Sequence, residues 1–366
     1  MANPIATGRD EREKALLVQV IVGRHDRERE RDSLVELERL ADTAGATVVG
    51  AMTQRRSSVT PRFYIGEGKL DEIRLACSRT GAGLVVFDNE LSAVQVNNLD
   101  LALGIKVIDR TELILQIFVR RARSAEAQVQ VGLAQLEYLV SRIPVSERQQ
   151  RFQGGIGMKG PGESPLQLRN APMRRRIREL RTRLAAMQRQ GQQTRQRRQL
   201  PRVCLVGYTN AGKSTLLNAF APAKAYVDDR LFATLDTKSR RIWLPDRRHV
   251  LLTDTVGFIR HLPHSLIASF RATLDEIREA DLLLLVADSS HPFVREHIDV
   301  ARQTLREIGA ETVPEILVVN KIDAPAARKM LPSLRHRYPE ALFVSARDRD
   351  CVPRIKQAIM AALPLE

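Results

Sequence analysis

Residues 202–220 read RVCLVGYTNAGKSTLLNAF, and this stretch decides the fold of the C-terminal half of the chain. The apolar run VCLV predicts a buried strand, and LLNAF continues as a helix. Between them, GYTNAGKST matches the pattern G-x-x-x-x-G-K-[ST] in the strand, loop and helix context of a phosphate-binding loop. In such a loop, backbone N–H groups wrap nucleotide phosphates, Lys213 reaches the β and γ oxygens, and Ser214 offers a hydroxyl to magnesium.

Downstream motifs have to support this prediction, because the loop pattern alone also occurs by chance. The predicted strand HVLLTDTVGF, residues 249–258, ends in Asp254-Thr255-Val256-Gly257. An acid at the carboxyl edge of a strand can hold magnesium, commonly through water, so Asp254 is a candidate ligand. Gly257 can bring its N–H to the γ-phosphate. Asp254 on its own would indicate only a helix cap or a turn.

A third motif lies at residues 320–323, where the apolar strand ILVV runs into Asn-Lys-Ile-Asp. This tetrapeptide resembles the NKxD base-reading motif of regulatory GTPases. By that resemblance, Asp323 accepts hydrogen bonds from guanine N1–H and the 2-amino group, and residues 345–347 support guanine O6. Open α/β sheets bind ligands at the carboxyl ends of their strands, so three such motifs in order predict one site. Its predicted nucleotide-binding residues are Gly207, Tyr208, Thr209, Asn210, Ala211, Gly212, Lys213, Ser214, Thr215, Asp254, Thr255, Val256, Gly257, Asn320, Lys321, Asp323, Ser345, Ala346 and Arg347.

The segment DDRLFATLDTKSRRI, residues 228–242, lies where such proteins keep a switch threonine that closes over magnesium and the γ-phosphate. Thr234 is the first choice and Thr237 the second, while either could be an ordinary strand threonine. The predicted magnesium ligands are Ser214, Thr234 and Asp254. The predicted catalytic residues are Lys213, Thr234 and Gly257.

Phe258 follows Gly257, where Ras-like GTPases carry a glutamine that orients the attacking water. A phenyl ring cannot do this, so hydrolysis should be slow in isolation or depend on a partner, another residue or an ion. Asn210 matches the asparagine with which similar GTPases bind potassium beside the phosphates. The alternative for Asn210 is a residue that shapes a tight turn.

The first 110 residues alternate short β-branched runs with amphipathic stretches. LLVQVIV, ATVVGAM, GLVVFD and IKVID predict strands, and the segments between them predict helices that mostly end at glycine. This order predicts a small parallel α/β domain over residues 1–110.

Residues 111–199 predict an antiparallel helical hairpin. Two helices carry apolar residues at alternating spacings of four and three, and antiparallel packing lets each apolar stripe escape water. The first seam is Val129, Leu133, Leu136, Val140 and Ile143, and the second is Met173, Ile177, Leu180, Leu184 and Met187. A glycine-rich tip loop spans about residues 144–171, and the second helix is rich in arginine. The predicted RNA-binding residues are Arg151, Lys159, Arg174, Arg175, Arg176 and Arg178; a solvated charged face and a flexible connector are the alternatives.

Composition points to a polyanionic partner. The 366 residues carry 58 Lys plus Arg against 43 Asp plus Glu, a net charge of +15 with a pI near 10.3. Nucleic acid is the first candidate. Aromatic residues make up 4%, which favours phosphate contact over base stacking. The three cysteines are dispersed and indicate buried thiols rather than a metal site. With no apolar leader and no spanning segment, a cytoplasmic protein is expected. The fold prediction is an α/β chain whose residues 200–366 form a P-loop GTPase domain, with a mostly parallel sheet covered by helices on both faces.

Four further stretches resemble one family. They are PRFYIGEGKLDEI at 61–73, the run from Val107 to Ile143, GGIGMKGPGES at 154–164, and the segment from Gly257 to Ser290. The sequence closely resembles the HflX family of bacterial ribosome-associated GTPases. The resemblance implies GTP, GDP and magnesium as ligands, some ATP hydrolysis, and a hairpin that inserts into the large ribosomal subunit and contacts its RNA. It also implies a GTP form that splits or rescues stalled ribosomes under stress, and we expect a monomer that is partly ribosome-associated.

This sequence departs from the family pattern in two places. GPGESPLQLRNAPMRRR replaces the usual GPGETQLE and acidic-basic run, and Pro165 and Pro172 are expected to interrupt the start of the second helix. The chain also stops at Glu366, whereas many relatives continue. Two rival functions stay open: a ribosome-assembly or RNA-modification GTPase, which the same catalytic residues would support, and a GTP-gated RNA-binding module with little turnover, which Phe258 suggests.

Overall fold

The computed structural model describes residues 12–23, 26–142, 165–196, 200–221, 231–232, 234–260 and 271–363. The chain forms two compact units. The first contains Met1–Arg120 and Tyr138–Pro172, and the second contains Arg121–Glu137 and Met173–Glu366. The division into three domains at residues 110 and 199 remains a prediction. Among the described helices, none is long and apolar enough to cross a membrane.

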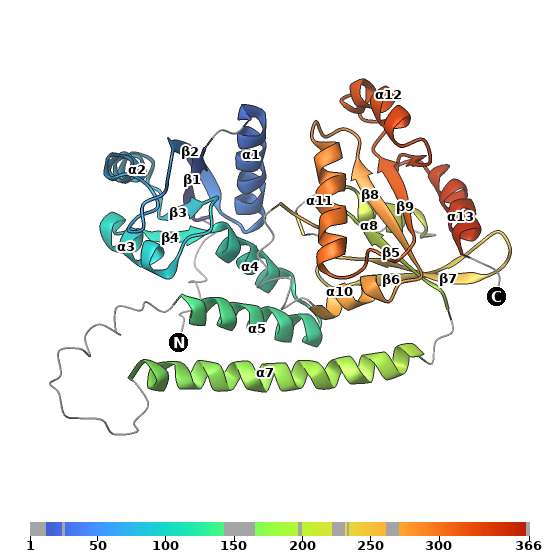
Figure 1. Cartoon of the computed structure of the whole chain (residues 1–366), viewed down its shortest axis with the longest axis horizontal. Coiled ribbons are helices and arrows are strands. Elements are labelled where there is room, and N and C mark those ends of the chain that lie inside the picture. Colours follow the sequence, from blue (N-terminus) through green and yellow to red (C-terminus); the bar gives the residue numbers. More distant parts are fainter. Residues whose placement is uncertain are drawn as a thin grey trace. The chain divides into compact units, whose positions relative to one another are not determined.

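The first unit is built on a four-stranded parallel sheet with strand order β2-β1-β3-β4 (Figure 1). Its elements are β1 (Lys14–Val22), α1 (Arg27–Thr43), β2 (Thr47–Arg56), α2 (Glu67–Thr80), β3 (Leu84–Phe87), α3 (Ala93–Leu103), β4 (Lys106–Asp109) and α4 (Arg110–Arg121). The alternating pattern thus gave the correct fold. Helices α2 and α3 end at Gly81 and Gly104, whose φ angles of 68° and 66° lie in the left-handed region that glycine enters without steric cost. Their apolar side chains form one core with β1 and β3.

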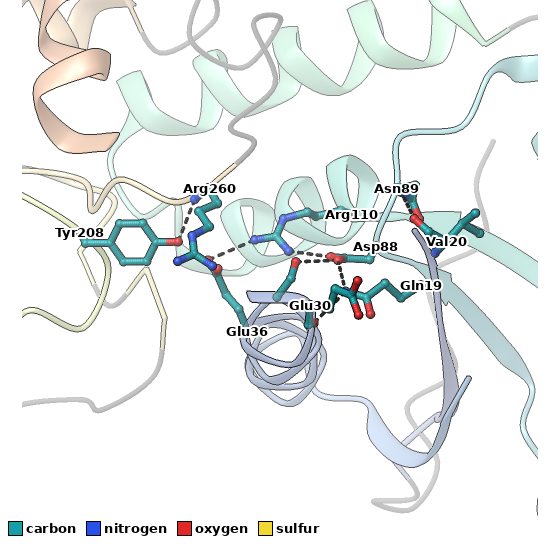
Figure 2. A network of polar contacts seen from close by, with 10 residues as sticks. Gln19, Val20, Glu30, Glu36, Asp88, Asn89, Arg110, Tyr208 and Arg260 are labelled. Atoms are coloured by element: carbon teal, nitrogen blue, oxygen red, sulfur yellow. Dashed lines mark hydrogen bonds and ion pairs between the residues drawn. The ribbon is translucent and has the colours of Figure 1, made fainter. Parts of the chain in front are cut away.

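A buried ion-pair network closes the carboxyl end of this sheet (Figure 2). Arg110 is only 3% exposed, and its guanidinium lies 2.7 Å from Asp88 and 3.0 Å from Glu36. Asp88 also accepts hydrogen bonds from Gln19 and Ser33. The guanidinium therefore compensates the charge of the two carboxylates inside the protein.

The helical hairpin is formed by α5 (Ala125–Ser141) and α7 (Pro165–Gln196). The seam is buried at Val129 and Leu133 of α5 and at Ile177, Leu180 and Leu184 of α7. The two helices are joined where Nε and Nη2 of Arg181 both donate to one carboxylate oxygen of Glu137, and where Leu180 approaches Gly132. The predicted seam packing is confirmed for these residues; Ile143 lies outside the described part.

One expectation about the hairpin is wrong. Helix α7 begins at Pro165, inside the predicted tip loop, and runs through Pro172 without a break. A proline is well tolerated at the start of a helix, where its missing N–H would be unbonded in any case. At Pro172 the helix continues at the expense of one main-chain hydrogen bond.

The second unit contains a six-stranded sheet with order β10-β9-β8-β5-β7-β6, parallel except for β6 (Figure 1). Its elements are β5 (Arg202–Val206), α8 (Lys213–Ala219), β6 (Lys238–Trp243), β7 (His249–Asp254), α10 (Arg271–Arg278), β8 (Leu282–Asp288), α11 (Val294–Glu307), β9 (Glu315–Asn320), α12 (Ala327–Arg337), β10 (Leu342–Phe343) and α13 (Cys351–Ala362). Helices α8 and α13 share a core with one face of the sheet, and α10, α11 and α12 share a core with the other. The predicted P-loop fold is confirmed.

Candidate nucleotide-binding site

Two glycines give the loop between β5 and α8 its shape. Gly207 has a φ of 137°, and a Cβ there would lie 2.2 Å from the carbonyl oxygen of Val286. Gly212 has a φ of 94°, and a Cβ there would lie 2.3 Å from the side-chain nitrogen of Asn320. Only glycine satisfies both the left-handed backbone and the close approach. The loop therefore lies at the carboxyl ends of β5, β8 and β9, as expected from the motif.

Lys213 opens α8 and turns its ammonium group into the loop. The Nζ atom donates to the carbonyl oxygens of Gly207 at 3.0 Å and Tyr208 at 2.9 Å. The side chain is buried, and this burial lowers the pKa of Lys213 to about 8, partly opposed by the nearby charge of Asp254. A buried ammonium with a lowered pKa is a strong partner for phosphate, because the anion restores the stability of its charged form.

Ser214, Thr234 and Asp254 converge on one point. The Ser214 and Thr234 hydroxyls donate to Oδ2 of Asp254 at 2.6 and 2.7 Å, and the two hydroxyl oxygens lie 2.8 Å apart. Asp254 is fully buried, and its Oδ1 has no hydrogen-bond partner among the described residues. A buried carboxylate oxygen without a partner beside two hydroxyls is an oxygen donor set that suits Mg²⁺. The geometry favours Thr234 over Thr237, since Thr237 is not part of this cluster.

The DTVG segment is joined to the phosphate-binding loop through the main chain. Phe258 N donates to the Gly207 carbonyl at 3.0 Å, and Thr209 N donates to the Phe258 carbonyl at 2.7 Å. A Cβ on Gly257 would lie 2.9 Å from Thr209 Cα and 3.0 Å from Lys213 Nζ. Residue 257 therefore has to be glycine for the two segments to meet this closely. The hydroxyl of Thr255 donates to a carbonyl of β5 at 2.7 Å, so its side chain holds the sheet edge together.

The ring of Phe258 is 2% exposed and belongs to the core beneath α10 and α11. Because this apolar ring is buried in the core, the Phe258 side chain does not position water at the site. Val256 is half-buried in the same segment.

Asn320 connects the base side of the site to the phosphate side. Its Nδ2 donates to the carbonyl of Ala211 at 2.9 Å, and its Oδ1 accepts from Ala346 N at 2.9 Å. Asn320 is 1% exposed, and its two hydrogen bonds join the phosphate-binding loop to residues 345–347. Lys321, with a φ of 61°, forms an ion pair with Asp288 at 2.7 Å.

Asp323 and Arg347 border a cavity of about 650 Å³. Their charged groups lie 4.0 Å apart, and Arg347 is largely exposed. Arg347 N is also 3.3 Å from the Ser345 hydroxyl, which orders the loop. Ser345 also lines this cavity, so residues predicted to read and support the base share one cavity.

The structure also shows the surroundings of three consecutive predicted residues of the phosphate-binding loop. The Tyr208 ring stacks on His297 of α11 at 3.8 Å, and its hydroxyl accepts from Arg260 N at 2.9 Å, so only the main chain of Tyr208 faces the loop interior (Figure 2 shows Tyr208 and Arg260). The sequence carried no signal for this stack. Thr209 has a buried Oγ1 without a partner among the described residues. Asn210 is exposed with a φ of 59°, a conformation that asparagine tolerates in tight turns, so the turn and the potassium interpretations both stand.

The predicted RNA-binding arginines of α7 are exposed. Arg174, Arg175, Arg176 and Arg178 occupy successive positions around α7, interrupted by the buried Ile177, and Glu179 pairs with two of them. Arg151 and Lys159 lie outside the described residues, and Thr215 lies half-buried in the first turn of α8.

A glycine-bounded phosphate loop, a hydroxyl and carboxylate cluster and an NKID segment on a P-loop sheet define a GTPase. Three family models match the chain: "GTP-binding GTPase N-terminal" over residues 31–119, "GTP-binding GTPase Middle Region" over 121–198, and "50S ribosome-binding GTPase" over 202–321. The chain is 44% identical to GTPase HflX of Caldanaerobacter subterraneus subsp. tengcongensis over 353 residues, 95% of this chain and 80% of that protein. It is 42% identical to GTPase HflX of Escherichia coli K12 over 365 residues, 97% of this chain and 84% of that protein.

The crystal structure of SsGBP in complex with GDP superimposes with a TM-score of 0.53 at 25% identity, covering 95% of this chain and 98% of that one. The chain belongs to the HflX family of GTPases, and it binds and hydrolyses GTP. The predicted resemblance is thus confirmed.

Proposed function

We propose that this GTPase acts on the ribosome in the cytoplasm, where its GTP form binds the large subunit and separates or rescues stalled ribosomes. The observation that carries the proposal is the set of exposed arginines of α7 from Arg174 onward, which belong to the same compact unit as the nucleotide site. Exposed arginines aligned along one helix fit the phosphates of structured RNA. The match to a 50S ribosome-binding GTPase model over residues 202–321 supports the same partner.

The roles of the site residues follow from their positions. Lys213, already directed into the loop, would pair with the β- and γ-phosphates, and the N–H of Gly257 would reach the γ-phosphate. Ser214, Thr234 and Asp254 would hold magnesium, whose charge neutralises the phosphate oxygens as the γ-phosphoryl group passes to water. Asp323 would select guanine, and the loop of Ser345 to Arg347 would support its O6 edge.

Because Phe258 points into the core, the water must be oriented by something other than residue 258. We assign this task to the ribosome-bound state, with potassium at Asn210 as a second contributor. The exposure of Asn210 leaves its amide oxygen accessible to such an ion.

The test is multiple-turnover GTP hydrolysis with and without purified large subunits, in potassium and in sodium, combined with light scattering of intact ribosomes. The proposal expects strong stimulation by large subunits and a fall in scattering with GTP. Stimulation without a fall would point to ribosome assembly or another ribosomal task. Without any stimulation the ribosome would be the wrong partner, and other RNAs would be tested next.

The potassium arm of the experiment has its own control. Asn210→Ala should abolish any preference for potassium over sodium while leaving GTP affinity within a few fold, because the phosphates are bound by the main chain of the loop. An unchanged preference in this variant would leave Asn210 with its turn-shaping role alone.

A further inference from the structure

Asp236 lies two residues beyond Thr234 and contacts the first helix of the hairpin. Its Oδ2 accepts from the backbone N–H of Arg123 at 2.9 Å and of Ser124 at 3.2 Å, and its Oδ1 accepts from the Ser124 hydroxyl at 2.5 Å. All of these residues belong to the second compact unit. No nucleotide-binding motif includes Asp236, so sequence patterns gave no reason to single it out.

These contacts meet the start of α5 in a specific way. Ser124 caps the helix, because its hydroxyl oxygen accepts from Ala127 N at 3.1 Å while donating to Asp236. The carboxylate of Asp236 takes up two further N–H groups at this end, where helices carry unpaired donors and a partial positive charge. Asp236 is therefore an external cap of α5, supplied by the segment between the phosphate-binding loop and β6.

The same segment carries the candidate magnesium ligand. Thr234 is hydrogen-bonded to Asp254, Leu235 is 4% exposed, and Asp236 reaches α5. Two residues of extended chain span at most about 7 Å, so a large displacement of Thr234 must move Asp236 as well. Conversely, a fixed Asp236 restricts how far Thr234 can withdraw from Asp254.

Helix α5 passes this restraint on to the arginine-rich helix. Glu137, three turns further along α5, binds Arg181 of α7 at 2.7 Å, and Val129 and Leu133 pack in the buried seam. The N-terminus of α5 thus contacts Asp236, two residues from Thr234, and a later turn of α5 contacts Arg181 of the arginine-rich helix.

We propose that Asp236 is a positioning residue that couples the nucleotide state of Thr234 to the N-terminus of α5, with Ser124 as its partner. In the described conformation Thr234 lies at Asp254 while the cap is formed, so a nucleotide and ion that hold Thr234 also favour the cap. Because such coupling is reciprocal, a partner that fixes the hairpin favours the closed position of Thr234. The proposal goes beyond the ribosomal function and does not depend on which RNA the hairpin binds.

The test is amide hydrogen exchange of the full chain with magnesium and either GDP or a non-hydrolysable GTP analogue. In the unchanged protein the amides of Arg123 and Ser124 should exchange roughly tenfold more slowly with the GTP analogue, a ratio within the usual range of coupling between two sites. Asp236→Ala should bring this ratio close to one, Ser124→Ala should reduce it, and Asp236→Asn, which keeps an acceptor oxygen, should restore part of it.

Asp26→Ala is the matched control, because Asp26 caps α1 through Glu28 N at 3.0 Å but lies in the other unit. It should leave the ratio at residues 123–124 unchanged. Equal protection in both nucleotide states of the unchanged protein would overturn the proposal. A tenfold ratio between the two nucleotide states that persists in Asp236→Ala would also overturn the proposal. If Asp236→Ala does not fold, an undiminished ratio in Ser124→Ala would overturn it instead.

Discussion

In each of the two sheets, acids lie at the carboxyl ends of parallel strands. The electrostatic surroundings of these acids differ between the two units. In the first unit, Asp88 is ion-paired with Arg110, and Asp109 is bound by Arg142, by the Tyr138 hydroxyl at 2.8 Å and by two backbone N–H groups. In the second unit, the described hydrogen bonds to Asp254 come from hydroxyl groups, and the nearby Lys213 ammonium is directed at main-chain carbonyls rather than into an ion pair with it.

This difference in the partners of the acids indicates which of the two sheet edges requires a ligand. A buried carboxylate costs several kcal/mol unless charge and hydrogen bonds compensate it. The first unit pairs these acids with its own arginines, so their negative charge is compensated inside the protein. The second unit leaves Oδ1 of Asp254 without a partner, and an external cation would complete it. The carboxyl ends of both sheets have the topology of a binding site, but only one has the electrostatics.

The largest expected effect comes from removing the internal cation of the first unit. Arg110→Met should lower the free energy of unfolding by about 3–5 kcal/mol, because Asp88 and Glu36 would remain buried without their cation. Urea unfolding of the full chain measures this, and GTP affinity should stay unchanged. Arg12→Met is the control, since its pair with Asp42 is more than half exposed and should contribute under about 1 kcal/mol. A cost below that of the control would mean that the first sheet edge is not held by Arg110.

The second prediction concerns Asp254, the acid of the nucleotide site. Asp254→Asn should lower GTP hydrolysis by roughly 100- to 1,000-fold, because the proposed magnesium loses its charged partner. The melting temperature without nucleotide should be unchanged or higher, since a buried anion is removed. Asp88→Asn should give the opposite pattern, a lower melting temperature with hydrolysis intact. If both variants lost stability alike, the contrast between the two sheet edges would be broken.

Sequence reasoning identified both sheets but could not see this contrast. Strand and helix alternation predicted the architecture, and the loop pattern placed Lys213 and Ser214 because their spacing is local. The state of an acid depends on distant residues: Arg142, which binds Asp109, lies 33 positions along the chain. For the same reason, Thr234 and Thr237 could not be separated by pattern, since only the fold brings one of them to Asp254.

The third prediction concerns Asn320, whose role is partly architectural. Asn320→Ala would leave the Ala211 carbonyl and Ala346 N–H buried without partners, at a cost of about 2–3 kcal/mol in folding stability. GTP affinity should fall as well, since the loop and residues 345–347 would no longer be joined. Thermal unfolding and nucleotide titration measure the two effects. Ser290→Ala, which removes only a contact to Asp288, should change both much less.

The smallest expected effect is a proton taken up by Lys213 when nucleotide binds. Burial lowers the pKa of Lys213 to about 8 from 10.5, so the folded protein holds this proton less tightly than the unfolded chain. The resulting cost to stability is fully present below pH 8 and disappears as the pH rises towards 10.5. Phosphate anions beside the ammonium raise the pKa of Lys213 again.

At pH 8.5, GTP binding with magnesium should therefore take up roughly half a proton or more. Calorimetric titrations in buffers of different ionisation enthalpy measure this number directly. Lys213→Arg is the control, because a guanidinium keeps its proton at this pH and should show no uptake. An uptake that persists in Lys213→Arg would assign the proton to another group, and its absence in the unchanged protein would mean that Lys213 is already fully charged. In the second case the edge of the second sheet would already contain a fully charged ammonium group before nucleotide binds, as the edge of the first sheet contains its guanidinium groups.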